Sequence, residues 1–219
     1  MTTPDFSLLE TVRLRRPLVH CVSNIVSAGD CANLALAVGA SPIMAQAPQE
    51  MEAIAAASAA AVLNTGTPDE EKFQACLLRG QVGVRLGRPV ILDPVGVGAS
   101  PWRLERAEAL LAAFTPSLLR VNLGEAQALL HQESQEQGVD SPAAGTPAQR
   151  AETARRLARE RGTAVLLSGA EDLVSDGDSL WKISGGSPRT AQITGTGCML
   201  SVLCGVFAAV EEDILTAAV

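Results

Sequence analysis

Tyrosine is missing from this chain of 219 residues, histidine occurs only twice, and lysine occurs only at Lys72 and Lys182. The net charge of −7 and the pI near 4.9 argue against binding to nucleic acid or to an anionic membrane surface. The five cysteines make an odd number and include no Cys-x-x-Cys pair. This pattern favours free thiols in a reducing cytoplasm over a disulfide framework or a zinc site.

The sequence also lacks an apolar run long enough to cross a membrane. Its longest apolar run extends from Met199 to Val210 and is interrupted by Ser201 and Gly205. A transmembrane helix needs about 20 apolar residues, so we interpret this run as a buried core helix. The first five residues contain no basic stretch followed by an apolar one, so we expect no targeting segment, no membrane association and a cytoplasmic protein.

Short β-branched runs alternate with alanine-rich helical stretches along a chain that is 47% hydrophobic. This alternation predicts an α/β fold, a three-layer αβα arrangement with a mostly parallel central sheet, in a single domain over residues 1–219. The predicted strands are Leu18–Val22, Ala61–Asn64, Val90–Leu92, Leu118–Val121 and Ala164–Leu167. The clearest predicted helices are Ala28–Val38, Pro68–Leu86 and Pro147–Arg161, each followed by glycine.

Two further segments depart from this alternation. Asp176-Gly177, between Leu173–Ser175 and Ser179–Ile183, predicts a two-residue hairpin turn and therefore an antiparallel ribbon late in the sheet. The stretch from His131 to Thr146 is rich in Gln, Glu, Ser, Gly and Pro, which predicts a surface loop.

Polar or glycine residues follow each predicted strand. In open parallel sheets ligands bind beyond the carboxyl ends of the strands, so these residues are the candidates for a functional site. The segments are His20 to Asn24, Asn64 to Thr67, Asp93 to Gly98, Arg120 to Glu125, Ser168 to Glu171 and the turn Gly195 to Cys198.

The turn Gly195-Thr196-Gly197-Cys198 precedes the predicted core helix. The start of a helix carries unpaired N–H groups and a partial positive charge, and glycine lets an anion come close to them. Phosphate or a developing oxyanion is the expected ligand, and the same field would lower the pKa of Cys198. The alternative is a glycine-rich turn that packs a core helix, with Cys198 as an inert small apolar residue.

Asp93 and Glu125 are two carboxylates that the predicted sheet brings to one edge. Mg²⁺ bound to a phosphate is usually held through one or two carboxylates and water. Glu125 could instead cap a helix, since it precedes a helical stretch.

Arg120 could bind phosphate or cap a strand end. We interpret His20 as a buried structural histidine rather than a general base, and we place the second histidine on the loop surface.

Several motifs then occur in a fixed order along the chain. They are Pro17 to His20 with Ser23-Asn24, Cys31 to Asn33, Gly39 to Met44, Val62 to Thr67, Val90 to Ala99 and Gly195 to Cys198. In this order they resemble the hydroxyethylthiazole kinases, over nearly the whole chain. The last motif carries particular weight, because the wider ribokinase-like superfamily usually has Asp where this family has Cys.

The resemblance implies a ribokinase-like fold and phosphorylation of the hydroxyl of 4-methyl-5-(2-hydroxyethyl)thiazole by ATP and Mg²⁺, in thiamine biosynthesis or salvage. It also implies a homotrimer with active sites at the subunit interfaces. The carried-over roles are thiazole contact for Met44 and Gly195, nucleotide contact for Arg120 and Ser168, ordering of magnesium and its waters for Asp93 and Glu125, and contact with the substrate hydroxyl for Cys198.

The chain departs from the family pattern at some points. Ser168-Gly169-Ala170-Glu171 replaces a Thr-Gly-Glu pattern, residues 121–125 vary the glycine-asparagine opening, and residues 27–30 are less apolar than usual. The chain ends at Val219, where the family has further helices, so we expect those C-terminal helices to be missing. Two other hypotheses stay open at this point: another ribokinase-like kinase, acting on hydroxymethylpyrimidine, pyridoxal or a sugar alcohol, and a non-catalytic nucleotide-binding protein.

Overall fold

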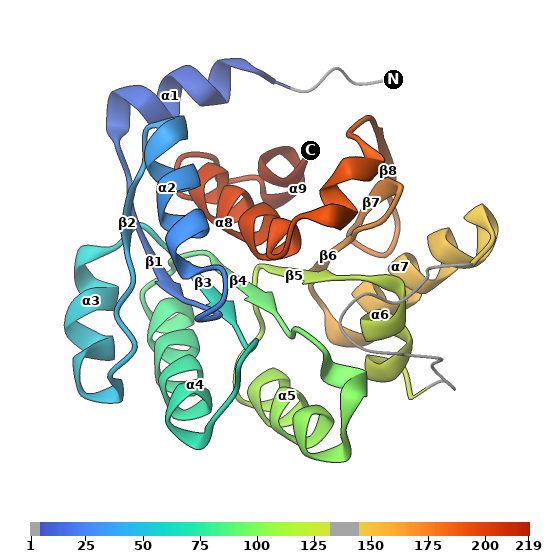
Figure 1. Cartoon of the computed structure of the whole chain (residues 1–219), viewed down its shortest axis with the longest axis horizontal. Coiled ribbons are helices and arrows are strands. Elements are labelled where there is room, and N and C mark those ends of the chain that lie inside the picture. Colours follow the sequence, from blue (N-terminus) through green and yellow to red (C-terminus); the bar gives the residue numbers. More distant parts are fainter. Residues whose placement is uncertain (1–4, 132–144) are drawn as a thin grey trace.

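The computed structural model describes residues 5–131 and 145–219, and its described strands form one sheet of eight (Figure 1). The spatial order is β2-β1-β3-β4-β5-β6-β7-β8. The first six strands in this order are parallel, and β7 and β8 are antiparallel to their neighbours. The bounds are β1 Leu18–Val22, β2 Ser41–Ile43, β3 Ala60–Asn64, β4 Val90–Asp93, β5 Leu118–Val121, β6 Ala164–Leu167, β7 Glu171–Ser175 and β8 Leu180–Ser184.

Helices cover both faces of the sheet, which gives the three layers that the sequence predicts (Figure 1). One face carries α1 Ser7–Arg15, α2 Ala28–Val38, α8 Thr196–Ala208 and α9 Ile214–Ala218. The other carries α3 Met51–Ala57, α4 Glu70–Arg85, α5 Pro101–Ala113, α6 Leu123–Leu129 and α7 Pro147–Arg161. Short 3₁₀ turns lie at Pro48–Glu50, Val97–Ala99 and Pro188–Gln192.

The apolar core is divided by the sheet into two clusters. Alternate residues of β3 and β4 point to opposite sides, so Leu63 and Leu92 join the cluster beneath α4, whereas Val62 and Ile91 join the cluster beneath α8. All four are buried, which explains why the central strands read as continuous apolar runs rather than alternating ones. No helix within the described residues is long and apolar enough to cross a membrane.

The five predicted strands are confirmed to within one residue, and the helices at Ala28–Val38 and Pro147–Arg161 are confirmed at both ends. The helix predicted from Pro68 begins later, because Asp69 caps it by accepting a hydrogen bond from Lys72 N at 2.7 Å. The edge strand β2 was missed, since it is three residues long and contains a proline.

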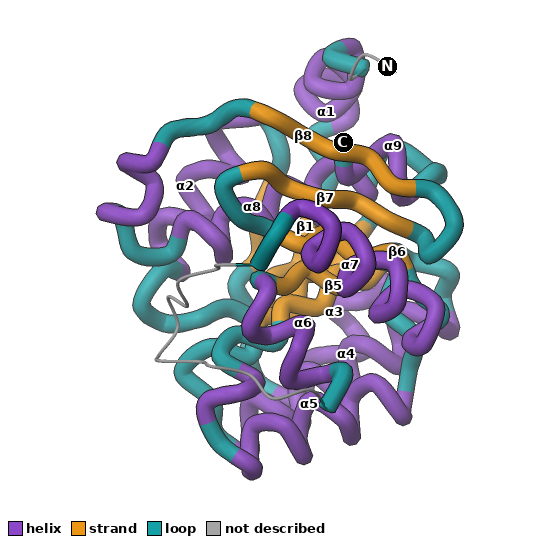
Figure 2. The backbone as a smooth tube through the Cα atoms, turned by 90° about the vertical axis from the view of Figure 1, so that its right-hand side faces the viewer, coloured by secondary structure: helices purple, strands orange, loops and turns teal. Residues whose placement is uncertain are grey.

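The antiparallel ribbon of β7 and β8 is also confirmed, and Figure 2 shows both strands beside β6 at one edge of the sheet. The predicted two-residue turn is wrong. Four residues, 176–179, connect the strands, and the Asp176 side chain organises them by accepting hydrogen bonds from the amides of Asp178 at 3.0 Å and Ser179 at 2.7 Å. Most of the predicted loop from 131 to 146 lies outside the described residues, and His131 at its start is exposed.

His20 is fully buried on β1, as the sequence predicts. Its Nδ1 accepts a hydrogen bond from Arg79 Nε at 3.0 Å, so Nε2 carries the proton and donates to Ala45 O at 2.9 Å. Burial, together with the charge of Arg79, lowers the pKa of His20 to about 4. The imidazole is therefore neutral at neutral pH, and it ties α4 to the backbone that follows β2.

This arrangement predicts a loss of stability in acid. Between pH 6.5 and about 4 the unfolded chain binds a proton at His20 while the folded chain does not, so the free energy of unfolding falls as the pH falls through this window. The expected loss is about 3 kcal/mol. Chemical denaturation of the wild type and of His20→Gln at pH 7, 5.5 and 4 should show the stability of the wild type falling relative to the variant. A difference that is independent of pH would contradict the buried neutral imidazole.

Candidate active site

A cavity of about 660 Å³ lies at the carboxyl ends of the central strands. Its lining residues come from all five predicted strand ends and from the start of α8. Of the predicted site residues, Arg120, Glu125, Ser168, Gly195 and Cys198 line it. Asp93 lies directly behind this lining, paired with Arg120, and is fully buried.

The start of α8 forms one wall of the cavity. Gly195 is the N-cap residue and has a φ of +86°, a left-handed conformation that glycine adopts without strain. Met199 N is bonded to Gly195 O at 2.9 Å, and the amides before it have no partner inside the helix. Gly197 lies against the Arg120 guanidinium, because a Cβ atom there would be 2.7 Å from both Nη atoms. The turn therefore presents unpaired amides beside a cation.

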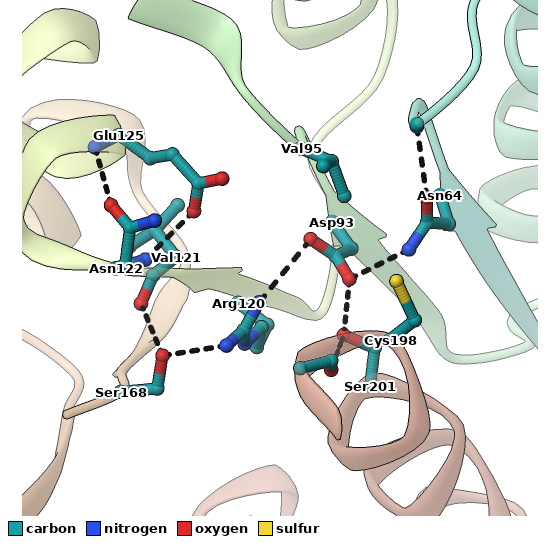
Figure 3. Close-up of polar contacts among 12 residues, drawn as sticks. Asn64, Asp93, Val95, Arg120, Val121, Asn122, Glu125, Ser168, Cys198 and Ser201 are labelled. Carbon is teal, nitrogen blue, oxygen red and sulfur yellow. Dashed lines mark hydrogen bonds and ion pairs between the residues drawn. The ribbon is translucent and has the colours of Figure 1, made fainter. Parts of the chain in front are cut away.

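Asp93, the last residue of β4, organises the polar side chains behind the cavity (Figure 3). Its Oδ2 accepts hydrogen bonds from Ser201 Oγ at 2.6 Å and from Asn64 Nδ2 at 2.8 Å, while its Oδ1 lies 3.6 Å from Arg120 Nη1. Burial raises the pKa of Asp93, and these three partners oppose that rise. Asp93 Oδ1 itself accepts no hydrogen bond within the described residues.

Arg120 connects the Asp93 carboxylate with the next strand end. Its Nη2 donates to Ser168 Oγ at 2.7 Å, and the Ser168 hydroxyl donates onward to Val121 O at 3.3 Å. Burial opposes the charge, yet Asp93 and Glu125 together raise the pKa of Arg120. Arg120, which the sequence analysis offered as a phosphate-binding residue, is thus a fixed cation at the cavity wall, held in place by Asp93 and Ser168.

Glu125 has the capping role that the sequence analysis weighed as the alternative. Asn122 is the N-cap of α6 and accepts from Glu125 N at 2.8 Å, while Glu125 Oε2 accepts from Asn122 N at 2.8 Å (Figure 3). Glu125 Oε1 also accepts from Gly96 N at 2.9 Å. Burial raises the pKa of Glu125 to about 7, with Arg120 opposing the rise. The carboxylate nevertheless lines the cavity, so capping and ligand binding are compatible.

Cys198 differs from its expected ionisation state. Its residue is 8% exposed, burial raises the pKa of its thiol, and the Asp93 carboxylate raises it further. The lowered pKa predicted from the helix start is therefore wrong, because burial and the Asp93 carboxylate raise it instead. The neutral thiol lies 4.0 Å from Asn24 Nδ2, on the side of the cavity opposite Ser168.

The two carboxylates are compatible with a hydrated magnesium ion that arrives with a phosphate and is held through water. Glu125 lines the cavity, whereas Asp93 lies buried behind it with Oδ1 facing Arg120 and accepting no hydrogen bond within the described residues. No group of three His, Cys, Asp or Glu side chains in this part of the chain could hold a metal by itself. Mg²⁺ ordinarily takes one or two carboxylates and completes its shell with water and phosphate oxygens.

One predicted site residue does not join the others. Met44 follows the edge strand β2 and is half-buried beside the cluster beneath α8, and it is not among the residues that line the cavity.

Sequence reasoning missed Ser201. This residue stands three positions after Cys198, which places both on one face of α8. Its hydroxyl is fully buried and donates to Asp93. A polar residue at helical spacing from the candidate thiol was the signal that could have identified it.

Known proteins of one family are similar to this chain over most of its length. The family model described as the hydroxyethylthiazole kinase family matches residues 9–219. A hydroxyethylthiazole kinase from Methanoculleus marisnigri is 43% identical over 211 residues, which are 96% of this chain and 75% of that protein.

Solved structures show the same relationship. The hydroxyethylthiazole kinase protein of Pyrococcus horikoshii superposes with a TM-score of 0.87 at 35% identity, over 97% of this chain and 79% of that one. Bacillus subtilis pyridoxal kinase superposes with a TM-score of 0.69 at 16% identity, over 92% and 86% of the two chains, and shares the fold. This is the ribokinase-like fold that the sequence predicts. On the family match, the identity and the superposition, the chain belongs to the hydroxyethylthiazole kinase family.

Proposed function

We propose that this protein transfers the γ-phosphoryl group of ATP to the hydroxyl of 4-methyl-5-(2-hydroxyethyl)thiazole, in thiamine biosynthesis or salvage. The observation that carries the proposal is the wall of unpaired α8 amides beside Arg120, with the Cys198 thiol of this family's motif in the first turn. Membership of the family favours this acceptor over pyridoxal or hydroxymethylpyrimidine.

The chemistry follows from charge and position. Phosphoryl transfer passes through a loose transition state, so catalysis depends on positioning and charge stabilisation. The amides of Gly197 and Cys198 would stabilise the transferring phosphoryl oxygens, and Arg120 would neutralise charge beside them. Bound through Asp93, Glu125 and water, Mg²⁺ would shield the charge between the phosphates. Ser168 would keep Arg120 in place and contact the nucleotide, and Gly195 would border the thiazole.

Cys198 has an assisting role in this proposal. A neutral thiol is a weak base, but a loose transition state requires little proton removal before the bond to the leaving oxygen breaks. The thiol can therefore orient the substrate hydroxyl, whose proton passes late in the reaction to an oxygen of the transferred phosphoryl group. A carboxylate at the same position would accept the proton more readily.

The assembly is part of the proposal. We infer a homotrimer with active sites at its interfaces, in which Met44 contacts the thiazole in a neighbour's site. Ile25, Val26 and Ile193 are 74%, 61% and 56% exposed, and two of them also line the cavity, so its rim is an apolar surface that a second subunit could cover.

The five unpaired cysteines support a cytoplasmic location.

The first test is acceptor-dependent release of ADP from Mg-ATP. We expect release with hydroxyethylthiazole and much less with pyridoxal or hydroxymethylpyrimidine. Release with another alcohol alone would assign a different acceptor. ATP binding without turnover, by folded protein and with all three alcohols, would favour the non-catalytic alternative.

Replacement of Cys198 tests its assisting role. Cys198→Ala should lower kcat by about 10- to 10³-fold and leave the KM for ATP nearly unchanged, because the amides of the anion site remain. Cys198→Asp should have a kcat at least equal to that of the wild type. Steady-state kinetics of the three proteins decides this, and an unchanged kcat in the alanine variant would reduce Cys198 to a packing residue.

A charge placed in the apolar rim of the cavity tests the proposed trimer. Sedimentation should give about three times the chain mass of 22.7 kDa for the wild type. Ile25→Lys should shift the protein toward monomer, because a charge would be buried in the interface. Leu86→Lys is the control, since Leu86 is 45% exposed at the end of α4, on the other face of the sheet. A trimer unaffected by Ile25→Lys would place the interface elsewhere.

A further inference from the structure

Lys72 is a buried lysine that the proposed chemistry does not use. It lies in the first turn of α4 and is 5% exposed. Its Nζ donates to Ser23 O at 2.7 Å, to Gly66 O at 2.7 Å and to Thr67 Oγ1 at 3.2 Å. An ammonium group has three N–H donors, and each one finds an acceptor here.

This position is unfavourable for a lysine. Burial lowers the pKa of Lys72, and the first turn of a helix carries a partial positive charge that repels a cation. No carboxylate forms an ion pair with Lys72 among residues 5–131 and 145–219. Leu or Met would fill the same space without desolvating a charge. Among the described residues, the three hydrogen bonds are therefore the direct contacts of the charge, and the Asp69 carboxylate opposes the fall in pKa without forming an ion pair.

The three acceptors belong to two different loops of the candidate site. Ser23 follows β1, and Gly66 and Thr67 follow β3, the neighbouring strand. Thr67 has a φ of +47°, uncommon for a non-glycine residue, and its Oγ1 also accepts from Ile25 N at 3.1 Å. Lys72 and Thr67 together fasten the loop after β1 to the loop after β3.

The two fastened loops meet the thiol through Asn24. Its Nδ2 lies 4.0 Å from Cys198 Sγ and its Oδ1 accepts from Val26 N at 3.0 Å, while the side chain packs against Gly66. Asn24, Gly66 and Thr67 all line the cavity. A shift of either loop would therefore change where Asn24 meets Cys198.

We propose that Lys72 is a positioning residue for the acceptor alcohol. Through Ser23 O, Gly66 O and Thr67 it fixes the loops after β1 and β3 so that Asn24 and Cys198 hold the hydroxyl in line with the phosphoryl group. The proposal rests on the proposed phosphorylation, and it predicts an effect on the acceptor rather than on ATP. Arg120 and Ser168, on the other side of the cavity, do not contact Lys72.

The test compares Lys72→Met with Lys182→Met, a change of the chain's other lysine. Lys182 is half-exposed on β8 and pairs with Glu171 at 2.6 Å, so its replacement should change neither KM. Lys72→Met should raise the KM for hydroxyethylthiazole about tenfold or more, while the KM for ATP changes by less than about twofold. Thr67→Val, which removes the hydroxyl and keeps the shape, should have the same effect as Lys72→Met: a higher KM for hydroxyethylthiazole and a nearly unchanged KM for ATP.

Hydrogen exchange without substrates supplies a readout that does not depend on activity. Amides 23–27 should exchange faster in Lys72→Met than in Lys182→Met, with α8 unchanged. Unchanged exchange at 23–27 would overturn the proposal, as would equal rises in both KM values. If Lys72→Met does not fold, Thr67→Val decides by the same two measurements. A wild type that does not phosphorylate the thiazole would refute the proposed function, whereas the exchange data would still decide whether Lys72 fixes the loops.

Discussion

The buried ion pair between Asp93 and Arg120 is the interaction around which this site is arranged. Removing one partner of such a pair generally costs about 3–5 kcal/mol, because the other charge stays buried and uncompensated. The two residues stand on the neighbouring strands β4 and β5, so the pair depends on the order of the parallel sheet. It also depends on α8, because Ser201 donates to Asp93 and Gly197 leaves room for the guanidinium. The packing of α8 on the sheet and the geometry of the site therefore depend on each other.

Most of the fold could be predicted from the sequence, because its signals are local. Apolar runs of four or five residues gave the central strands, and glycines gave the ends of α2 and α7. The exceptions have physical reasons. β2 is three residues long and is a strand through its pairing with β1, a contact from another part of the chain. The turn between β7 and β8 is set by side-chain bonds of Asp176 that composition does not distinguish from a tight hairpin.

The residues at the strand ends that form the site could be predicted from the sequence, but their burial and their hydrogen-bond partners could not. Parallel strands bring their carboxyl ends to one edge, and the structure gathers Arg120, Glu125 and Ser168 there. The sequence does not reveal how deeply a group is buried. For this reason the predicted lowering of the Cys198 pKa was wrong, since the thiol is buried and the Asp93 carboxylate raises its pKa further. Roles for individual residues stay proposals until kinetics tests them.

Two buried cations, which form no ion pair with a carboxylate in the described part of the chain, connect α4 to the sheet and its loops. Arg79 bonds to His20 and Ser58, and Lys72 bonds to two carbonyls and a hydroxyl. Both project from α4, Lys72 toward the loops that follow β1 and β3, and Arg79 toward a side chain within β1 and a hydroxyl just before β3. The neutral acceptors of Lys72 satisfy its ammonium group only while both loops keep their place, so displacement of a loop leaves a desolvated charge without a partner. Burying this charge lowers the stability of the fold, but it also makes movement of the two loops costly. These loops lie on the side of the cavity where the proposed acceptor alcohol would be held.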